Sequence, residues 1–310
     1  MLVEEVCYAR VGLMGNPSDG FEGKTLSFLL KNFSARVTIE HQEDEGIEIV
    51  PHPSLDTPHC FASMPSLCQH VREHGYYGVF RLMLATCSSF GRLCMARGMQ
   101  DRIQRGFRLR YETSIPRMVG LSGSSALIVA AFKGLLRFYN LSLDELGITK
   151  AQFPQIILNI EKEDLGISAG LQDRVIQTYG GLVHMDFSKE LMSSLGTGRY
   201  TELDVNLLPN MYLAYNFRYG SDSGTVHSTV RDRWRNQDPQ LVEGMRRLGS
   251  LADEAVATLH AHNYAKLALL MEENFAIRRS LYGDEVVGRA NIAAIELLRS
   301  FGFAAKFCGR

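Results

Sequence analysis

Residues 116–126 read Pro-Arg-Met-Val-Gly-Leu-Ser-Gly-Ser-Ser-Ala and lead directly into an apolar run with helical character, Leu127 to Tyr139. A glycine-rich loop at the start of a helix presents backbone N–H groups and the positive end of the helix dipole. This arrangement binds phosphate groups, and serine hydroxyls beside it add donors or a metal ligand. The residues therefore predict a nucleotide-phosphate site near residue 120.

The composition is that of an ordinary globular protein. The chain has 310 residues, of which 45% are hydrophobic, and 33 Lys and Arg nearly balance 34 Asp and Glu. This balance argues against nucleic acid or an anionic membrane as a partner. The N-terminus lacks the pattern of a signal peptide, and the six cysteines form no Cys-x-x-Cys pair. We therefore expect a soluble, cytoplasmic protein.

The order of the predicted elements indicates an α+β protein. Strands are expected over residues 6–14, 25–30, 35–39, 107–113, 182–187 and 211–216. Capping boxes at Ser142 with Glu145 and at Thr149 with Gln152 predict two helix starts. The last third is mostly helical, with long helices expected over residues 239–262, 263–281 and 289–300. Strands and helices alternate in the first part of the chain, and helices predominate in the last part. This order favours two lobes with a boundary near residue 205.

An acidic segment is the second candidate for chemistry. Residues 161–173 contain four carboxylates, at Glu161, Glu163, Asp164 and Asp173, and are interrupted by two glycines. One interpretation is a solvated helix end with turn glycines. The other is functional, because Mg²⁺ bound with a nucleotide uses one or two carboxylates and proton transfer needs another. Glu161 follows an apolar helical face, so we expect it to point inward.

Two further glycine turns leave alternatives open. Residues 18–25, Ser-Asp-Gly-Phe-Glu-Gly-Lys-Thr, nearly match a P-loop, which would make the chain a P-loop phosphohydrolase. A P-loop needs a long helix after Thr25, whereas strand-like residues follow. Residues 220–228 are either a helix start capped by Ser223 or Thr225 or a loop that contacts substrate.

Three of these segments, in this order, resemble the GHMP small-molecule kinases. The first is Tyr8 to Asp19, the second Pro116 to Ala126 and the third Glu161 to Asp173. Within that family the chain is most similar to the plant-type glucuronokinases, through residues 15–25, 115–125, 165–174, 179–189, 221–228 and 271–275. The resemblance implies a two-lobed fold, with an N-terminal kinase domain over residues 1–205 and a C-terminal domain over 206–310. The chain stops where the family's third glycine-rich motif begins, so we expect a C-terminally truncated form.

The resemblance also implies a reaction and its residues. It implies phosphorylation of the anomeric hydroxyl of D-glucuronate by ATP with Mg²⁺, a step that feeds UDP-glucuronate synthesis. Asp173 would be the base and Arg10 the cation beside it, while Ser125 and Glu161 would hold Mg²⁺. Candidates for the substrate carboxylate are Lys24, Arg117 and Arg174. The residues implied to bind the ATP phosphates are Gly120, Leu121, Ser122, Gly123, Ser124, Ser125 and Ala126.

Two other functions remain open beside this one. The chain could phosphorylate a different sugar, such as galacturonate or galactose, at the same position. It could instead be a non-catalytic homologue that binds nucleotide or sugar. Comparing uronic acids with neutral sugars distinguishes the first alternative, and nucleotide binding without turnover distinguishes the second.

Overall fold

The computed structural model describes residues 1–50, 59–76, 78, 80–215 and 224–309. It divides into two compact units, each built from separate stretches of the chain. The first unit contains residues 1–9, 30–115 and 122–169, and the second contains residues 10–29, 116–121 and 170–310. Two long strands, β1 (Leu2–Met14) and β2 (Lys24–His41), contribute residues to both units. The boundary expected between residues 205 and 206 stays a prediction.

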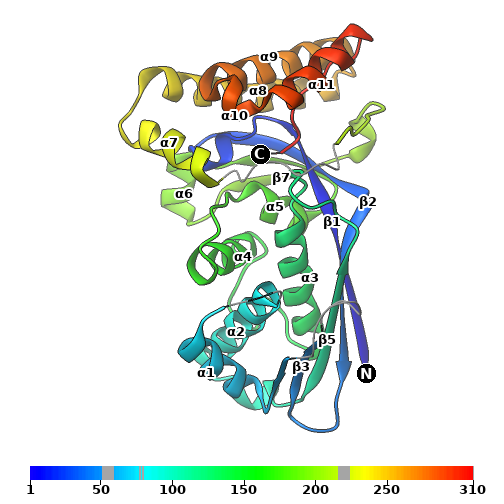
Figure 1. The fold of residues 1–310 in the computed structure, drawn as a ribbon, viewed down its shortest axis with the longest axis vertical. Coiled ribbons are helices and arrows are strands. Elements are labelled where there is room, and N and C mark those ends of the chain that lie inside the picture. The colour runs from blue at the N-terminus through cyan, green and yellow to red at the C-terminus, as the bar shows by residue number, and fades with distance from the viewer. Residues whose placement is uncertain (51–58, 77, 79, 216–223, 310) are drawn as a thin grey trace. The chain divides into compact units, whose positions relative to one another are not determined.

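The first unit combines a sheet with a group of helices (Figure 1). Its strand order is β4-β3-β5-β2, and β5 runs antiparallel to β2, with Ala35 opposite Thr113 and His41 opposite Phe107. Its other strands are β3 (Ile47–Val50), β4 (His59–Phe61) and β5 (Phe107–Thr113). Its helices are α1 (Met64–His74), α2 (Arg81–Ala96), η2 (Gln100–Ile103), α3 (Gly123–Phe138), α4 (Phe153–Asn159) and the π-helical turn Ile160–Asp164.

Helix α3 is the buried centre of the first unit. It is apolar on nearly all sides, which is typical of a helix surrounded by other elements. The Phe132 ring contacts Phe90 of α2, with ring centroids 5.4 Å apart, and Phe153 of α4, with centroids 5.3 Å apart. All three rings are fully buried. Packing on two sides therefore fixes the helix that follows the glycine-rich loop.

The second unit pairs a smaller sheet with most of the helices. Residues 24–28 of β2 run antiparallel to β6 (Leu182–Asp186), which runs antiparallel to β7 (Arg199–Leu203). The helices are α5 (Gln172–Tyr179), α6 (Lys189–Leu195), α7 (Gly224–Arg235), α8 (Pro239–His260), α9 (Tyr264–Tyr282), α10 (Asp284–Val287) and α11 (Arg289–Ser300), with short turns at η1 (Ser18–Gly20) and η4 (Val205–Leu207). None of the helices within the described residues is long and apolar enough to cross a bilayer.

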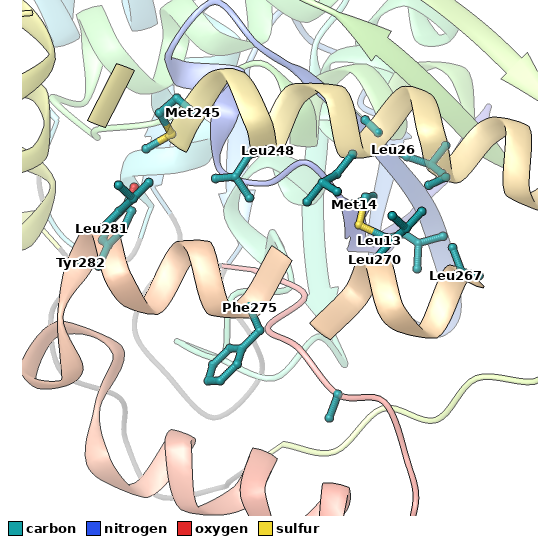
Figure 2. Close-up of a cluster of buried hydrophobic side chains, with 14 of the residues drawn as sticks. Leu13, Met14, Leu26, Met245, Leu248, Leu267, Leu270, Phe275, Leu281 and Tyr282 are labelled. Carbon is teal, nitrogen blue, oxygen red and sulfur yellow. The ribbon is translucent and has the colours of Figure 1, made fainter. Parts of the chain in front are cut away.

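A hydrophobic core holds the second unit together. Figure 2 shows apolar side chains of α8 and α9 facing one another and the ends of β1 and β2. Leu248 of α8 is fully buried and Leu13 of β1 is 2% exposed. Both long helices begin at side-chain caps: Asp238 accepts from the backbone N–H of Leu241, and Asn263 accepts from that of Lys266. The core therefore anchors the strand ends that carry Arg10 and Lys24.

The structure confirms the mixed α and β character and corrects several elements. The expected strand over 107–113 and the three long C-terminal helices are present. The strands expected over 25–30 and 35–39 are one continuous strand, β2. The capping-box bonds between Ser142 and Glu145 form, but they close a turn rather than a helix.

The strand expected over residues 211–216 is wrong for its described part. Residues 211–215 have no regular structure, and Asn216 lies outside the described residues. Tyr212 is 85% exposed, and its ring centroid lies 6.1 Å from that of Phe303. Residues 220–223 of the turn expected over residues 220–228 lie outside the described residues, and α7 begins at Gly224.

Candidate active site

The glycine-rich loop has the backbone expected of an anion-binding loop. Met118, Gly120 and Ser122 have φ angles of 59°, 75° and 63°, alternating with residues of ordinary φ. Left-handed backbone at Met118 and Ser122 is rare for residues with side chains and tends to occur at functional sites. A backbone that alternates in this way turns successive N–H groups toward one point and so binds anions. Helix α3 starts directly after it, at Gly123.

Glu161 is the carboxylate that the first unit brings to this loop. It is fully buried within the π-helical turn that follows α4, as expected from its place after an apolar face. The Ser124 hydroxyl donates to Glu161 Oε1 at 2.9 Å, whereas the Ser125 hydroxyl donates to the Ser122 carbonyl at 3.2 Å. The predicted pairing of Ser125 with Glu161 at a metal stays a prediction, and the structure adds Ser124 to the candidates.

The contact between Ser124 and Glu161 gives a stability prediction. In Ser124→Ala the buried carboxylate loses a donor, so the free energy of unfolding should fall by about 1–3 kcal/mol. Ser125→Ala removes only a bond between neutral groups and should lower it by about 0.5–1.5 kcal/mol. Urea unfolding of both variants measures the difference. If Ser125→Ala is the less stable of the two variants, Ser124 is not the main hydroxyl donor to the buried Glu161 carboxylate.

The donors around Glu161 fit a hard divalent cation. A buried carboxylate oxygen beside a serine hydroxyl is the kind of ligand set that Mg²⁺ takes, and the positive charge would offset the burial of the carboxylate. Within the described part of the chain no group of three or more His, Cys, Asp or Glu side chains could hold a metal by itself. Any Mg²⁺ here would therefore also need phosphate oxygens and water as ligands.

The other carboxylates of the acidic segment have different surroundings. Asp164 accepts two hydrogen bonds from Arg92 Nη2, at 2.8 and 2.9 Å, and one from the Tyr76 hydroxyl at 3.1 Å. Glu163 is exposed. Asp173 belongs to the second unit and lies in the first turn of α5. The segment thus contains one structural ion pair, one solvated carboxylate and two candidates for chemistry.

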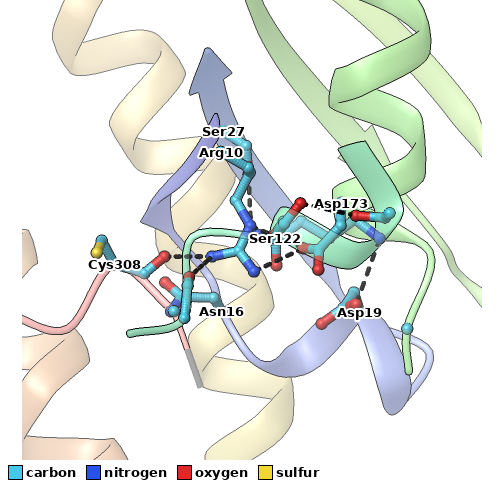
Figure 3. Close-up of polar contacts among 12 residues, drawn as sticks. Arg10, Asn16, Asp19, Ser27, Ser122, Asp173 and Cys308 are labelled. Atoms are coloured by element: carbon cyan, nitrogen blue, oxygen red, sulfur yellow. Dashed lines mark hydrogen bonds and ion pairs between the residues drawn. The ribbon is translucent and has the colours of Figure 1, made fainter. Parts of the chain in front are cut away.

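Arg10 and Asp173 form the centre of the site in the second unit (Figure 3). Arg10 comes from β1 and is only 5% exposed. Its Nε and Nη2 lie 2.7 and 2.6 Å from Asp173 Oδ1, and its Nη1 donates to the carbonyls of Gly120 at 3.1 Å and Cys308 at 2.5 Å. One guanidinium therefore joins the carboxylate to the glycine-rich loop and to the C-terminal segment. The predicted placement of Arg10 beside Asp173 is present in the geometry.

A small polar cavity lies at this ion pair. Asn16, Asp19 and Gln172 join Arg10 and Asp173 in its wall, together with Pro17, Gly170 and Gly309. Gln172 Nε2 donates to Ser27 Oγ at 2.7 Å, and the backbone N–H of Gln172 donates to Asp19 Oδ2 at 3.4 Å. The sequence contained Asn16 and Asp19 inside a family motif, but nothing in their spacing identified them as cavity residues. The guanidinium, amide and carboxylate groups of this wall can hydrogen-bond to hydroxyl groups.

The C-terminal segment closes one side of this cavity. A Cβ on Gly309 would lie 2.0 Å from the Gly120 carbonyl oxygen, so only glycine permits this approach. Lys306 Nζ donates to the Gly12 carbonyl, to Asn16 Oδ1 and to the Phe307 carbonyl at 2.7–2.9 Å. Burial, with help from the nearby cations Arg278 and Arg10, lowers the pKa of Lys306 to about 7. Sequence reasoning missed this lysine because no motif contains it.

The lowered pKa of Lys306 predicts a pH-dependent stability. Below about pH 7 this lysine is charged in both the folded and the unfolded chain, and the folded chain bears the full penalty of burying it. As pH rises from about 7 to about 10, the folded chain releases the proton first and the penalty is relieved. Lys306→Met should therefore be stabilised relative to the wild type most at pH 6 and least at pH 10. The urea midpoints of both proteins, measured across this pH range, test the prediction. A stability difference between variant and wild type that does not change with pH would contradict the lowered pKa of Lys306.

The three cations proposed for the substrate carboxylate occupy different environments. Lys24 Nζ lies 2.8 Å from Asp253 and 3.5 Å from Asp186, within an ion-pair cluster of the second unit. Arg174 is buried against Asp173, while Arg117 is exposed. Lys24 and Thr25 are the first residues of strand β2. The P-loop alternative is therefore wrong, because the lysine of a P-loop opens a helix.

Comparisons with known proteins agree with this geometry. Residues 89–181 match the family described as GHMP kinases N terminal domain. Glucuronokinase 1 and probable glucuronokinase 2 of Arabidopsis thaliana are each 46% identical to the chain, over 99% of its length and over 82% and 81% of their own lengths. The chain belongs to the GHMP kinases. Within them it is a member of the glucuronokinase family.

Solved structures show the same fold at low identity. Mevalonate kinase of Methanococcus jannaschii covers 100% of this chain and 87% of its own length, with a TM-score of 0.71 and 17% identity. Galactokinase of Lactococcus lactis, solved with galactose, covers 91% of this chain and 76% of its own length, with a TM-score of 0.69 and 15% identity. These likenesses establish the fold, and the expected two-lobed GHMP class is confirmed.

Proposed function

We propose that the protein transfers the γ-phosphoryl group of ATP to the anomeric hydroxyl of D-glucuronate, giving D-glucuronate 1-phosphate and ADP in the cytoplasm. The observation that carries the proposal is the ion pair between the buried Arg10 and Asp173 in the wall of a polar cavity. The identity to two glucuronokinases across most of their length supports the choice of sugar acid. Such a reaction depends on positioning and charge neutralisation more than on covalent chemistry.

The residues of the second unit supply the acceptor chemistry. The hydroxyl oxygen attacks the γ-phosphorus, the bond from that phosphorus to the β–γ bridging oxygen breaks, and ADP leaves. Asp173 takes the hydroxyl proton. We assign it to Oδ2, which Arg174 contacts at 3.2 Å, because Arg10 contacts Oδ1 more closely through both Nε and Nη2, at 2.7 and 2.6 Å. Arg10 keeps the carboxylate ionised, since an adjacent cation favours the charged form.

The loop at residues 120–126 supplies phosphate binding. Its left-handed residues and the following helix N-terminus favour anionic groups, as described above. Ser124, Ser125 and Glu161 are the residues that would hold Mg²⁺. When bound, the metal would neutralise charge on the phosphates.

A coupled assay for ADP with ATP and D-glucuronate tests the proposal, with phosphorus NMR to identify a sugar 1-phosphate. D-galacturonate and D-galactose run in parallel identify the acceptor. Turnover with D-glucuronate well above that with the other two is expected. Turnover favouring galactose would instead support a neutral-sugar kinase, and nucleotide binding without turnover on any sugar would support the non-catalytic alternative.

Arg117 is our candidate for the substrate carboxylate. A cation must balance that carboxylate, and a guanidinium does so with two parallel hydrogen bonds. Of the three cations proposed, Arg117 is the exposed one, whereas Lys24 and Arg174 already contact aspartates. Arg117→Gln should raise KM for D-glucuronate by roughly 10- to 100-fold, as loss of a charged hydrogen bond predicts, while leaving KM for ATP unchanged. Equal KM values for D-glucuronate in variant and wild type would reject this role.

A further inference from the structure

Arg174 is a buried cation that the mechanism above does not use. It follows Asp173 in the first turn of α5, and its side chain is only 4% exposed. Its Nη1 donates to the Gly170 carbonyl at 2.8 Å and lies 3.2 Å from Asp173 Oδ2. Among the described residues, the wall of the cavity includes Asp173 and Gly170 but not Arg174. The guanidinium therefore contacts the carboxylate from behind the cavity surface.

The two oxygens of Asp173 are contacted by two different arginines. Arg10 reaches Oδ1 from β1, and Arg174 reaches Oδ2 from α5. A carboxylate that is contacted at only one oxygen turns about its Cβ–Cγ bond, because that torsion is broad. Contacts at both oxygens restrict it to one plane. The bond from Arg174 to Gly170 fixes the second arginine in turn.

We propose that Arg174 is a positioning residue: it sets the plane of the Asp173 carboxylate so that Oδ2 faces the acceptor hydroxyl. This inference rests on the proposed phosphoryl transfer. Two flanking cations also make the carboxylate a weak base. A weak base suits an anomeric hydroxyl, which is more acidic than an ordinary alcohol. The pair of arginines thus favours acceptors of the hemiacetal class over simple alcohols.

The other charges around Asp173 define what a pH experiment will report. Arg10 comes from β1 and Arg174 from α5, and Asp19 of the turn η1 accepts from the backbone N–H of Gln172. Lys306 of the C-terminal segment interacts electrostatically with Arg10. Arg174→Gln and Arg174→Lys share these other groups, so a difference in titration between the two variants reports the charge at residue 174.

Arg174→Gln and Arg174→Lys, assayed beside the wild type, test the proposal. In Arg174→Gln we expect kcat to fall roughly 10- to 100-fold, as for loss of one charged hydrogen bond, with KM for both substrates within about twofold of wild type. The acidic limb of the kcat profile should move to higher pH, since loss of a cation raises the pKa of a carboxylate. Arg174→Lys keeps the charge, so its acidic limb should stay near the wild type. Arg246→Gln, on the exposed side of α8, is the matched control.

Two results would overturn the proposal. If Arg174→Gln raises KM for the sugar acid and leaves kcat unchanged, Arg174 is a substrate ligand and not a positioning residue. If Arg174→Gln changes neither kcat nor its pH profile, Arg174 does not position Asp173. A readout without turnover is a carbon-13 NMR titration of the aspartate carboxyls, with the Asp173 signal identified by its loss in Asp173→Asn. The midpoint should rise in Arg174→Gln, and an unmoved midpoint rejects the contact. If the wild type phosphorylates no sugar, the proposed function fails, while this titration still decides the role of Arg174.

Discussion

Replacing Asp173 with Asn is expected to lower kcat by about 10²–10⁴-fold, the contribution typical of general base catalysis. Asparagine keeps the shape of the side chain but cannot take a proton from the acceptor hydroxyl. ATP binding should persist, because the residues proposed for the phosphates lie in the loop at 120–126. Steady-state turnover and isothermal titration with a non-hydrolysable ATP analogue measure the two effects separately.

Glu163→Gln is the matched control for this variant. Glu163 belongs to the same acidic segment but is exposed, so its loss should change kcat by less than about twofold. A variant Asp173→Asn with turnover close to wild type would reject Asp173 as the base. Loss of ATP binding together with turnover would show instead that the substitution disturbs the fold.

The sequence predicted the parts of the site that depend on local pattern. The glycine-rich loop before α3 and the inward position of Glu161 both follow from residues close together in the chain. Which serine contacts Glu161 does not, because it depends on the rotation of α3 and on the π-helical turn at 160–164. The family resemblance implied Ser125 as a metal ligand, which stays a prediction, and the hydroxyl that contacts Glu161 in the structure is that of Ser124.

Contacts between distant residues could be predicted only through the family resemblance. Arg10 and Asp173 are 163 residues apart, and no periodicity connects them. The C-terminal contacts from Lys306 and Gly309 were missed for the same reason. Strand β7 was missed because its residues, Arg199 to Leu203, are mostly polar and become a strand only by pairing with β6. Pairing of this kind is a tertiary property that overrides local propensity.

The Arg10–Asp173 pair also predicts a large effect on stability. Arg10→Gln leaves the Asp173 carboxylate without its nearest cation and removes the donor to the Gly120 and Cys308 carbonyls. Arg174 still contacts the partly exposed Asp173 carboxylate, so we expect the free energy of unfolding to fall by on the order of 3 kcal/mol, the lower end of the range for a buried pair that loses one partner. Turnover should fall as well, since the loop and the base lose their common anchor. Urea unfolding followed by circular dichroism measures the stability, with exposed Arg235→Gln as the control.

The double variant Arg10→Gln/Asp173→Asn decides whether the loss comes from an unpaired charge. Each single substitution leaves one charge of the Arg10–Asp173 pair without the other, whereas the double substitution removes both charges of this pair. Arg174 still contacts Asp173 in Arg10→Gln and loses that carboxylate equally in Asp173→Asn and in the double variant. The double variant should therefore be more stable than the sum of the two single losses predicts, by about 1–3 kcal/mol of coupling. Additive losses would mean that Arg10 stabilises the fold through the Gly120 and Cys308 carbonyls alone. In that case the ion pair with Asp173 would not contribute to the stability of the fold. The role of Arg10 would then be to hold the glycine-rich loop through the Gly120 carbonyl.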